Sequence, residues 1–315
     1  MKRLLKKILL FSIVFVGFTL ILNVFNIKII ENTVFKINDD VNKLILGSSR
    51  SQCAIDDNVL KNTLNMSSAA DSNFYSYLKL NNILDNNPQI DTVFISVSPR
   101  SISEFLEKRW LFNKSHFSAR IGNYYYLMDK NDFQMLWNHF GLDFFKIGIP
   151  NIIVRSFKNF KEILIGDIKG VYGGYEALHR DKLEEALARL KIDIFEESEL
   201  VESKIGIYYL EKIVNLCKRN NIKIFFISPP IRREYVKLKY NDYLKFDIFL
   251  NSKYADITYL DFTLFPMSDS EYADIHHLNH LGSKRFSQFL QEKGIENIIL
   301  ESHLNKYGFK SVIYK

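Results

Sequence analysis

Two short segments far apart in the chain hold residue types that could together perform nucleophilic chemistry. The first, "GSSR", begins at Gly47 after an apolar run, and the second, "DIHH", begins at Asp274. Asp274 and His277 are three residues apart, so a carboxylate on a turn can reach one imidazole nitrogen while the other faces a nucleophile. We predict that Ser49 is this nucleophile and that Ser48 is a turn hydroxyl.

These residues need a scaffold that brings them together, and the chain shows alternating strand and helix signals. Short apolar runs followed by small or polar residues predict strands at 43–46, 63–66, 92–97, 222–227 and 257–260. Apolar residues at three- and four-residue spacing predict helices at 73–84, 203–220 and 282–294, the last ending at Gly294. This alternation predicts an α/β domain with a mostly parallel five-stranded sheet, in which ligands bind beyond the carboxyl ends of the strands.

The alternation is interrupted between the third and fourth predicted strands. Residues 102–200 are rich in aromatic and long apolar side chains and contain both tryptophans. We expect a helical insertion or lid over one end of the sheet, and the alternative is that its aromatic residues form a satellite core.

The N-terminus carries a different signal. Residues 9–22 have no charge, and the apolar character continues to about Asn26, roughly enough to cross a ~30 Å hydrocarbon layer. Lysine and arginine precede this run at positions 2, 3, 6 and 7. The positive-inside rule therefore places the N-terminus in the cytoplasm and the rest of the chain outside it. A cleaved signal peptide is the alternative, but no small-x-small cleavage site follows, so we expect a retained single-pass anchor.

Composition limits the remaining classes. The net charge of +6 includes the basic N-terminus, and no basic block is interleaved with aromatic residues, so we do not expect nucleic acid as a partner. Cys53 and Cys217 are the only cysteines. We expect both to be buried apolar residues, with a disulfide as the alternative. The histidines around His277 lack metal-ligand spacing, so neither a metal nor another cofactor is expected.

The order of the motifs resembles the SGNH or GDSL-type hydrolase superfamily, which has a serine after the first strand and an Asp-x-x-His near the end of the domain. The resemblance covers about residues 43–101 and 205–292. It implies a flavodoxin-like three-layer sandwich with Ser49 as nucleophile and with Asp274 and His277 completing the catalytic unit. The chain looks most like the membrane-anchored branch, similar to the D-alanyl transfer protein of teichoic acid operons and to SGNH-like proteins of polysaccharide acetylation.

The resemblance also implies an oxyanion hole, and the chain departs from the family pattern there. The backbone N–H groups of Ser49 and of Ala70 or Ser67 are the expected donors. Where many members have Gly-x-Asn-Asp after the third strand, this chain has "SVSP" at 96–99, so the side-chain amide is missing. Loss of one donor typically costs on the order of a hundredfold in rate.

The implied function is that of an extracytoplasmic serine esterase or O-acyltransferase that acts on a surface polysaccharide, with acetyl as the expected acyl group. The resemblance implies a multi-spanning membrane O-acyltransferase as a possible partner. Arg50 and Arg100 are candidates for binding an anionic sugar or phosphate, although such arginines often pair with a nearby carboxylate. A non-catalytic polymer-binding subunit is the main alternative, and a protease using the same residues is a weaker one.

The expected organisation follows from these assignments. We expect a basic N-terminus and membrane anchor at 1–30, a first part of the SGNH-like domain at 31–101 and the insertion at 102–200. The second part of the domain is expected at 201–295, and a C-terminal tail at 296–315.

Overall fold

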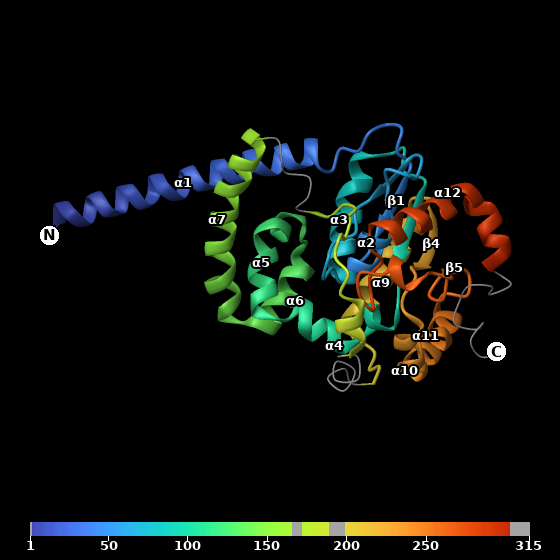
Figure 1. The fold of residues 1–315 in the computed structure, drawn as a ribbon. Helices are drawn as coiled ribbons and strands as arrows, with labels where there is room; N and C mark the ends of the chain where they lie inside the picture. Colours follow the sequence, from blue (N-terminus) through green and yellow to red (C-terminus); the bar gives the residue numbers. More distant parts are fainter. Residues whose placement is uncertain (1, 166–171, 189–198, 303–315) are drawn as a thin grey trace. The chain divides into compact units, whose positions relative to one another are not determined.

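The computed structural model describes residues 2–165, 172–188 and 199–302, which divide into two compact units (Figure 1). The sheet unit contains the described residues of 38–111 and 172–315, and the helical unit contains those of 1–37 and 112–171.

The sheet unit is built on five parallel strands in the order β2-β1-β3-β4-β5. The strands are β1 (Lys43–Leu46), β2 (Thr63–Asn65), β3 (Thr92–Ser96), β4 (Lys223–Ser228) and β5 (Thr258–Asp261). Each lies within two residues of its predicted bounds, so the α/β prediction is confirmed. The order is the flavodoxin-like, doubly wound one. Every residue of β3 is buried, as expected for a central parallel strand that is covered on both faces.

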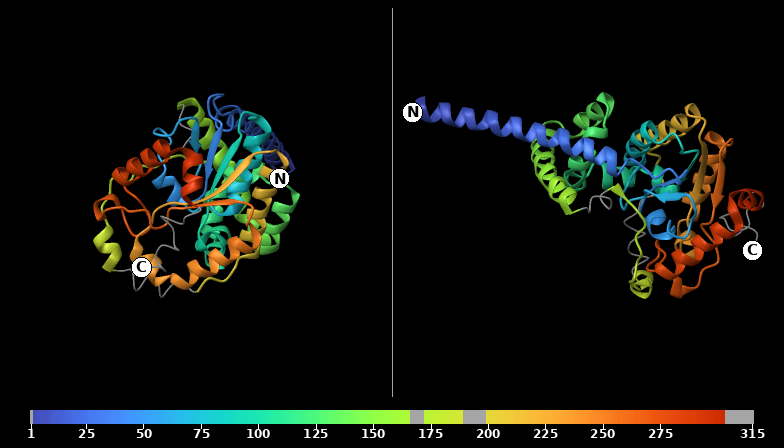
Figure 2. Two further views of the ribbon diagram at one scale, coloured as in Figure 1. Left: turned by 90° about the vertical axis from the view of Figure 1, so that its right-hand side faces the viewer. Right: turned by 90° about the horizontal axis from the view of Figure 1, so that it is seen from above.

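Helices cover both faces of this sheet (Figure 2). The main ones are α2 (Ser49–Ala54), α3 (Asn73–Asn86), α9 (Lys204–Arg219), α10 (Arg233–Leu238), α11 (Tyr240–Lys253) and α12 (His280–Ser302). Helix α3 packs against α9, and α2 packs against α12. Short helical segments occupy the connections: η1 (Pro99–Ile102), α4 (Glu104–Leu106), η2 (Glu107–Leu111) and η5 (Asp269–Glu271). The predicted stop at Gly294 appears as a break inside α12, where φ is 69°.

The helical unit contains α1 (Lys2–Thr33), α5 (Lys114–Tyr124), η3 (Tyr125–Leu127), α6 (Lys130–Phe140) and α7 (Leu142–Ile165). Among the described residues, α1 is the one helix that is long and apolar enough to cross a membrane. Helix α7 packs against α1, α5 and α6. The predicted 102–200 segment is thus divided: its residues 112–165 fold with the N-terminal helix, and the described residues of 102–111 and 172–200 fold with the sheet.

Candidate active site

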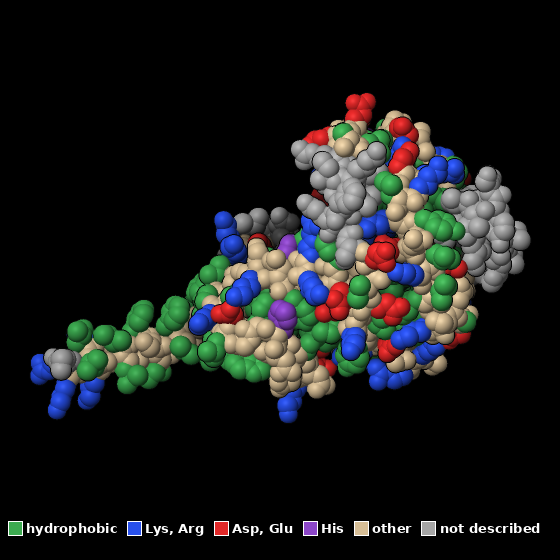
Figure 3. Space-filling model, turned by 90° about the horizontal axis from the view of Figure 1, so that it is seen from below, with side chains coloured by type: hydrophobic (Ala, Val, Ile, Leu, Met, Phe, Trp, Pro, Cys, Tyr) green, Lys and Arg blue, Asp and Glu red, His purple; other side chains and the backbone are tan. Residues whose placement is uncertain are grey.

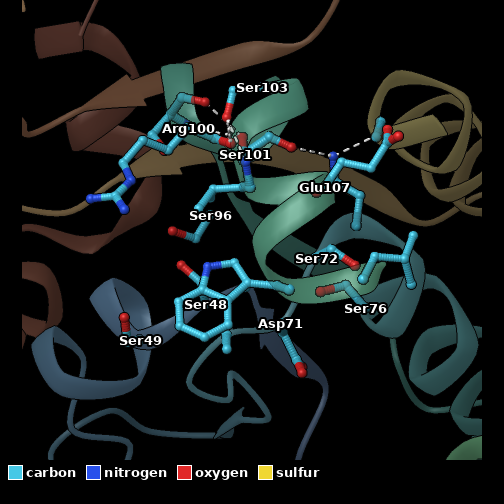
Figure 4. Close-up of a pocket in the computed structure, with 18 of the residues that line it drawn as sticks. Ser48, Ser49, Asp71, Ser72, Ser76, Ser96, Arg100, Ser101, Ser103 and Glu107 are labelled. Carbon is cyan, nitrogen blue, oxygen red and sulfur yellow. Dashed lines mark hydrogen bonds between the residues drawn. The ribbon is translucent and has the colours of Figure 1, made fainter. Parts of the chain in front are cut away.

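The carboxyl ends of β1 and β3 border a cavity of about 180 Å³ in the sheet unit (Figure 4). Strand β1 lies between β2 and β3, so the direction of the crossovers reverses here, and this is where doubly wound sheets bind ligands. The cavity wall is rich in serine: Ser48, Ser49, Ser72, Ser76, Ser96, Ser98, Ser101, Ser103 and Ser203. An apolar part of the wall contains Phe74, Leu106, Trp110, Leu111 and Ile205.

The turn after β1 presents Ser49 as the first residue of α2. Gly47 allows this turn to lie tightly against β3, because a Cβ at this position would come within 2.5 Å of Ser96 Cβ and 2.6 Å of Ser51 Oγ. Ser51 Oγ donates a hydrogen bond to Ser48 O (3.1 Å) and ties the turn to the helix. A glycine is therefore needed at this position for steric reasons.

The structure brings Ser49, His277 and Asp274 into one hydrogen-bonded chain. Ser49 Oγ lies 2.9 Å from His277 Nε2, and His277 Nδ1 lies 2.8 Å from Asp274 Oδ1 and 2.9 Å from Oδ2. An ionised carboxylate only accepts hydrogen bonds, so Nδ1 carries the proton and Nε2 is free to accept one from the serine hydroxyl. This is the arrangement that activates a serine for attack on a carbonyl carbon.

Asp274 is held ionised and in place by its surroundings. Burial alone would raise the pKa of Asp274, but the hydrogen bond and charge of His277 and the N–H of His276 outweigh it and lower this pKa well below its ordinary value. The backbone N–H groups of His276 and His277 donate to Oδ1 at 2.8 and 3.0 Å, and Arg180 donates to Oδ2 at 3.0 Å.

The loop that carries His277 is fixed by the two residues after it. Leu278 is fully buried in the core beside β5. Asn279 caps the start of α12, because its Oδ1 accepts hydrogen bonds from the N–H groups of Leu281 (3.0 Å) and Gly282 (3.1 Å). Its Nδ2 donates to Ser270 O at 2.7 Å, so the same side chain also ties the loop to η5.

Of the two candidates for a second oxyanion donor, Ala70 borders the cavity beside Ser49. Its φ of 60° places it in the left-handed region, at a turn closed by a hydrogen bond from Asp71 N to Ser68 O (3.0 Å). Ser67 is fully buried, is not among the residues lining the cavity, and already donates its N–H to Asn65 Oδ1 (3.0 Å). The geometry therefore favours Ala70 and not Ser67.

A buried ion pair supports the Ala70 turn. Lys79 Nζ donates to Asp71 Oδ2 (2.6 Å), to Tyr172 O (3.0 Å) and to Met66 O, and the lysine and aspartate side chains are both fully buried. Because Asp71 immediately follows Ala70, the position of the turn depends on a cation from α3.

Sequence reasoning did not single out Ser96, which lines the cavity beside Gly47 (Figure 4). Its Oγ lies 3.3 Å from where a Cβ on Gly47 would be. Parallel pairing of Leu46 with Ile95 places Gly47 and Ser96 side by side, so aligning the predicted strand ends could have identified this hydroxyl.

The two predicted anion-binding arginines have different surroundings. Arg50 lines the cavity but is buried, with its guanidinium 6.0 Å from the ring centroid of Tyr235. Arg100 also lines the cavity, and its Nη1 lies 3.3 Å from His276 Nε2. Both residues line the cavity, and Arg100 is the more accessible of the two.

His276 makes the stability of the fold depend on pH. Burial, followed by the charges of Arg100 and Arg50, lowers the pKa of His276 well below its ordinary value of 6.5. The unfolded chain takes up this proton below pH 6.5 and the folded chain does not, so acidification favours unfolding, by up to about 1.4 kcal/mol per pH unit.

We expect His276→Gln to flatten the decline in melting temperature between pH 6.5 and pH 5 relative to the wild type. Thermal unfolding of both proteins across pH 5 to 8 measures this difference. Parallel curves would contradict a His276 that stays neutral in the folded protein.

Both cysteines are buried and free, so their expected role as apolar residues holds and they do not form a disulfide. Burial raises the pKa of each thiol to about 12.

Comparison with known proteins adds little to this picture. A model of an uncharacterised protein family matches residues 180–300, a segment that includes Asp274 and His277 but not Ser49. No curated protein matches the chain.

Proposed function

We propose that this protein is a serine-dependent acyl esterase or O-acyltransferase of the SGNH type. The observation that carries the proposal is the hydrogen-bonded chain from Ser49 Oγ through His277 to Asp274. In the reaction, Ser49 Oγ attacks an ester carbonyl while His277 Nε2 accepts its proton. His277 then gives this proton to the departing alcohol, which leaves an acyl-Ser49 ester.

The developing oxyanion has donors available near Ser49. The N–H of Ser49 is at the start of α2, where helical N–H groups have no intrahelical acceptor, and the Ala70 turn borders the same cavity. The Ser96 hydroxyl lies close to Gly47 and can donate to the oxyanion the hydrogen bond that the missing asparagine amide would donate. Water as acceptor completes hydrolysis, and a sugar hydroxyl completes acyl transfer.

The size of the cavity supports a short acyl group such as acetyl. Pockets for drug-sized ligands measure about 300–1,000 Å³. The cavity here is smaller, at about 180 Å³. A polysaccharide acceptor would therefore remain mostly outside it, with Arg100 at the edge as a contact for an anionic polymer.

The N-terminal helix supports a location at the cell envelope. Lysine and arginine at 2, 3, 6 and 7 precede the apolar part of α1, which favours a cytoplasmic N-terminus and an extracytoplasmic sheet unit. A surface polymer is then within reach, and a multi-spanning membrane acyltransferase is the proposed source of acyl groups.

The test is covalent labelling of the full chain in detergent micelles with a fluorophosphonate, read by intact mass and peptide mapping. We expect one adduct, on Ser49, in the wild type and in Ser48→Ala, and none in Ser49→Ala. The neighbouring serine is the matched control for any general effect on the turn. A folded wild type that takes up no adduct would refute the proposal and favour a polymer-binding subunit.

A further inference from the structure

Helix α7 has an apolar face that the rest of the helical unit leaves largely exposed. At three- and four-residue spacing, this face carries five large apolar side chains that are 42% to 68% exposed: Leu142, Phe145, Ile149, Phe157 and Phe160. The same spacing places Ile153 among them. The residues facing the rest of the unit, including Phe144, Gly148 and Ser156, are buried. A helix with such an exposed face needs an apolar environment.

The other helices of the unit explain which side of α7 is left open. Phe117 of α5 contacts Phe144, with ring centroids 5.7 Å apart, so α5 covers one side. Figure 1 shows α5 and α6 on one side of α7 and the N-terminal part of α1 projecting from the other, and the view from above in Figure 2 agrees. The exposed apolar face of α7 therefore lies on the side from which the N-terminal part of α1 projects.

Helices α1 and α7 cross at a steep angle and are joined by polar contacts (Figure 1). Asn26 Nδ2 donates to Ser156 O at 2.6 Å, and the Ser156 hydroxyl donates to Asn23 Oδ1. Tyr125 OH also donates to Asn23 Oδ1, at 2.8 Å. These bonds join Asn23 and Asn26 of α1 to Ser156 and Tyr125 and fix the level at which α7 crosses α1.

This crossing lies at the end of the apolar stretch of α1. Exposed large apolar side chains run along α1 from Leu4 to Phe25, and Figure 3 shows them on the projecting rod, whose tip is basic. The contacts with α7 begin at Phe18, whose ring centroid is 6.2 Å from that of Phe157, and extend to Asn26. If α1 spans a bilayer, a helix crossing it steeply at this level lies along the membrane surface.

We propose that α7 lies in the membrane–water interface and inserts its apolar face among the lipids of the bilayer that α1 spans. The lipid-facing surface of α1 continues directly onto this face, which favours lipid over a second protein chain. Exposed lysines at 146, 158 and 161 can extend their ammonium groups to lipid phosphates, as on interfacial amphipathic helices. The inference requires α1 to span the membrane but does not depend on the serine chemistry.

The test uses the full chain, with Cys53→Ala and Cys217→Ala, carrying one environment-sensitive fluorophore on an introduced cysteine. Phe145→Cys and Ile149→Cys report on α7, and Val14→Cys reports on the middle of α1. Ala119→Cys is the matched control, because it is exposed on the side of α5 away from Phe117 and Ile121. The proteins are reconstituted into phosphatidylcholine and phosphatidylglycerol vesicles, with lipids that carry a quencher either near the carbonyl group or deep in the acyl chain.

We expect the shallow quencher to quench the α7 probes more than the deep quencher does. With the shallow quencher, the loss of fluorescence at the α7 probes should be about twofold or more greater than at the Ala119 control. The Val14 probe should respond most to the deep quencher. Quenching at Val14 without quenching at Phe145 and Ile149 would overturn the interfacial position of α7. Absence of quenching at Val14 would show that α1 does not span the membrane and would therefore also overturn the interfacial position of α7. This outcome would leave the proposed chemistry of Ser49 unaffected.

Discussion

Asp274→Asn is expected to lower the rate of acyl-enzyme formation by about four orders of magnitude while the protein stays folded. The carboxylate accepts from His277 Nδ1 at 2.8 Å and therefore fixes the tautomer in which Nε2 can take the proton of Ser49. An amide at this position can donate to Nδ1, which turns the proton to Nε2 and blocks the base. Stopped-flow measurement with an activated acetyl ester gives this rate, and far-ultraviolet circular dichroism checks the fold.

Arg180→Gln is the matched control for this prediction. Arg180 pairs with the other carboxylate oxygen of Asp274 at 3.0 Å, but its side chain is 48% exposed. Exposed pairs contribute about 0–1 kcal/mol, so we expect less than about a tenfold change in rate. A loss of rate in Arg180→Gln as large as that in Asp274→Asn would show that charge near the site, and not the imidazole tautomer, controls the reaction.

Lys79→Met is expected to lower the free energy of unfolding of the sheet unit by about 3–5 kcal/mol. The ammonium group is fully buried against Asp71 and also donates to backbone carbonyls, so its removal leaves a buried carboxylate without this cation. Pulse proteolysis of the full chain across a urea series in detergent measures the change.

Lys218→Met provides the comparison, because Lys218 also pairs with an aspartate but is 50% exposed. For this variant we expect a change of about 0–1 kcal/mol. Equal effects of the two substitutions would contradict a structural role for the buried pair. The Lys79 variant should also react more slowly with a fluorophosphonate under conditions in which it is fully folded, because Asp71 anchors the Ala70 turn.

The sequence was most informative where one residue type or one period determines the local structure. Apolar runs ending in small residues located the strands, since parallel strands are buried on both faces. The positions of Ser49, Asp274 and His277 relative to predicted strands and helices were enough to expect them together, because carboxyl ends of parallel strands share one edge.

The features of the site that the sequence did not predict depend on three-dimensional contacts. Ser67 and Ala70 are three residues apart, and they are distinguished by the burial of Ser67, by the hydrogen bond from its N–H to Asn65 Oδ1 and by the position of Ala70 at the cavity wall. The position of the Ser96 hydroxyl beside Gly47 depends on the parallel register of β1 and β3, and this register is set by the two strands together. The packing of α1 against α7 includes hydrogen bonds of Asn23 and Asn26 with Ser156, and no local sequence pattern predicts these contacts.

The two thiols have a consequence for how the protein matures. Cys53 and Cys217 are both buried, and with each pKa raised to about 12 neither forms the thiolate that disulfide exchange requires. The native state thus needs no oxidative folding catalyst, and it presents no accessible thiolate that could attack oxidised glutathione. A chain folded in a reducing cytosol and one folded in an oxidising compartment share the same covalent structure.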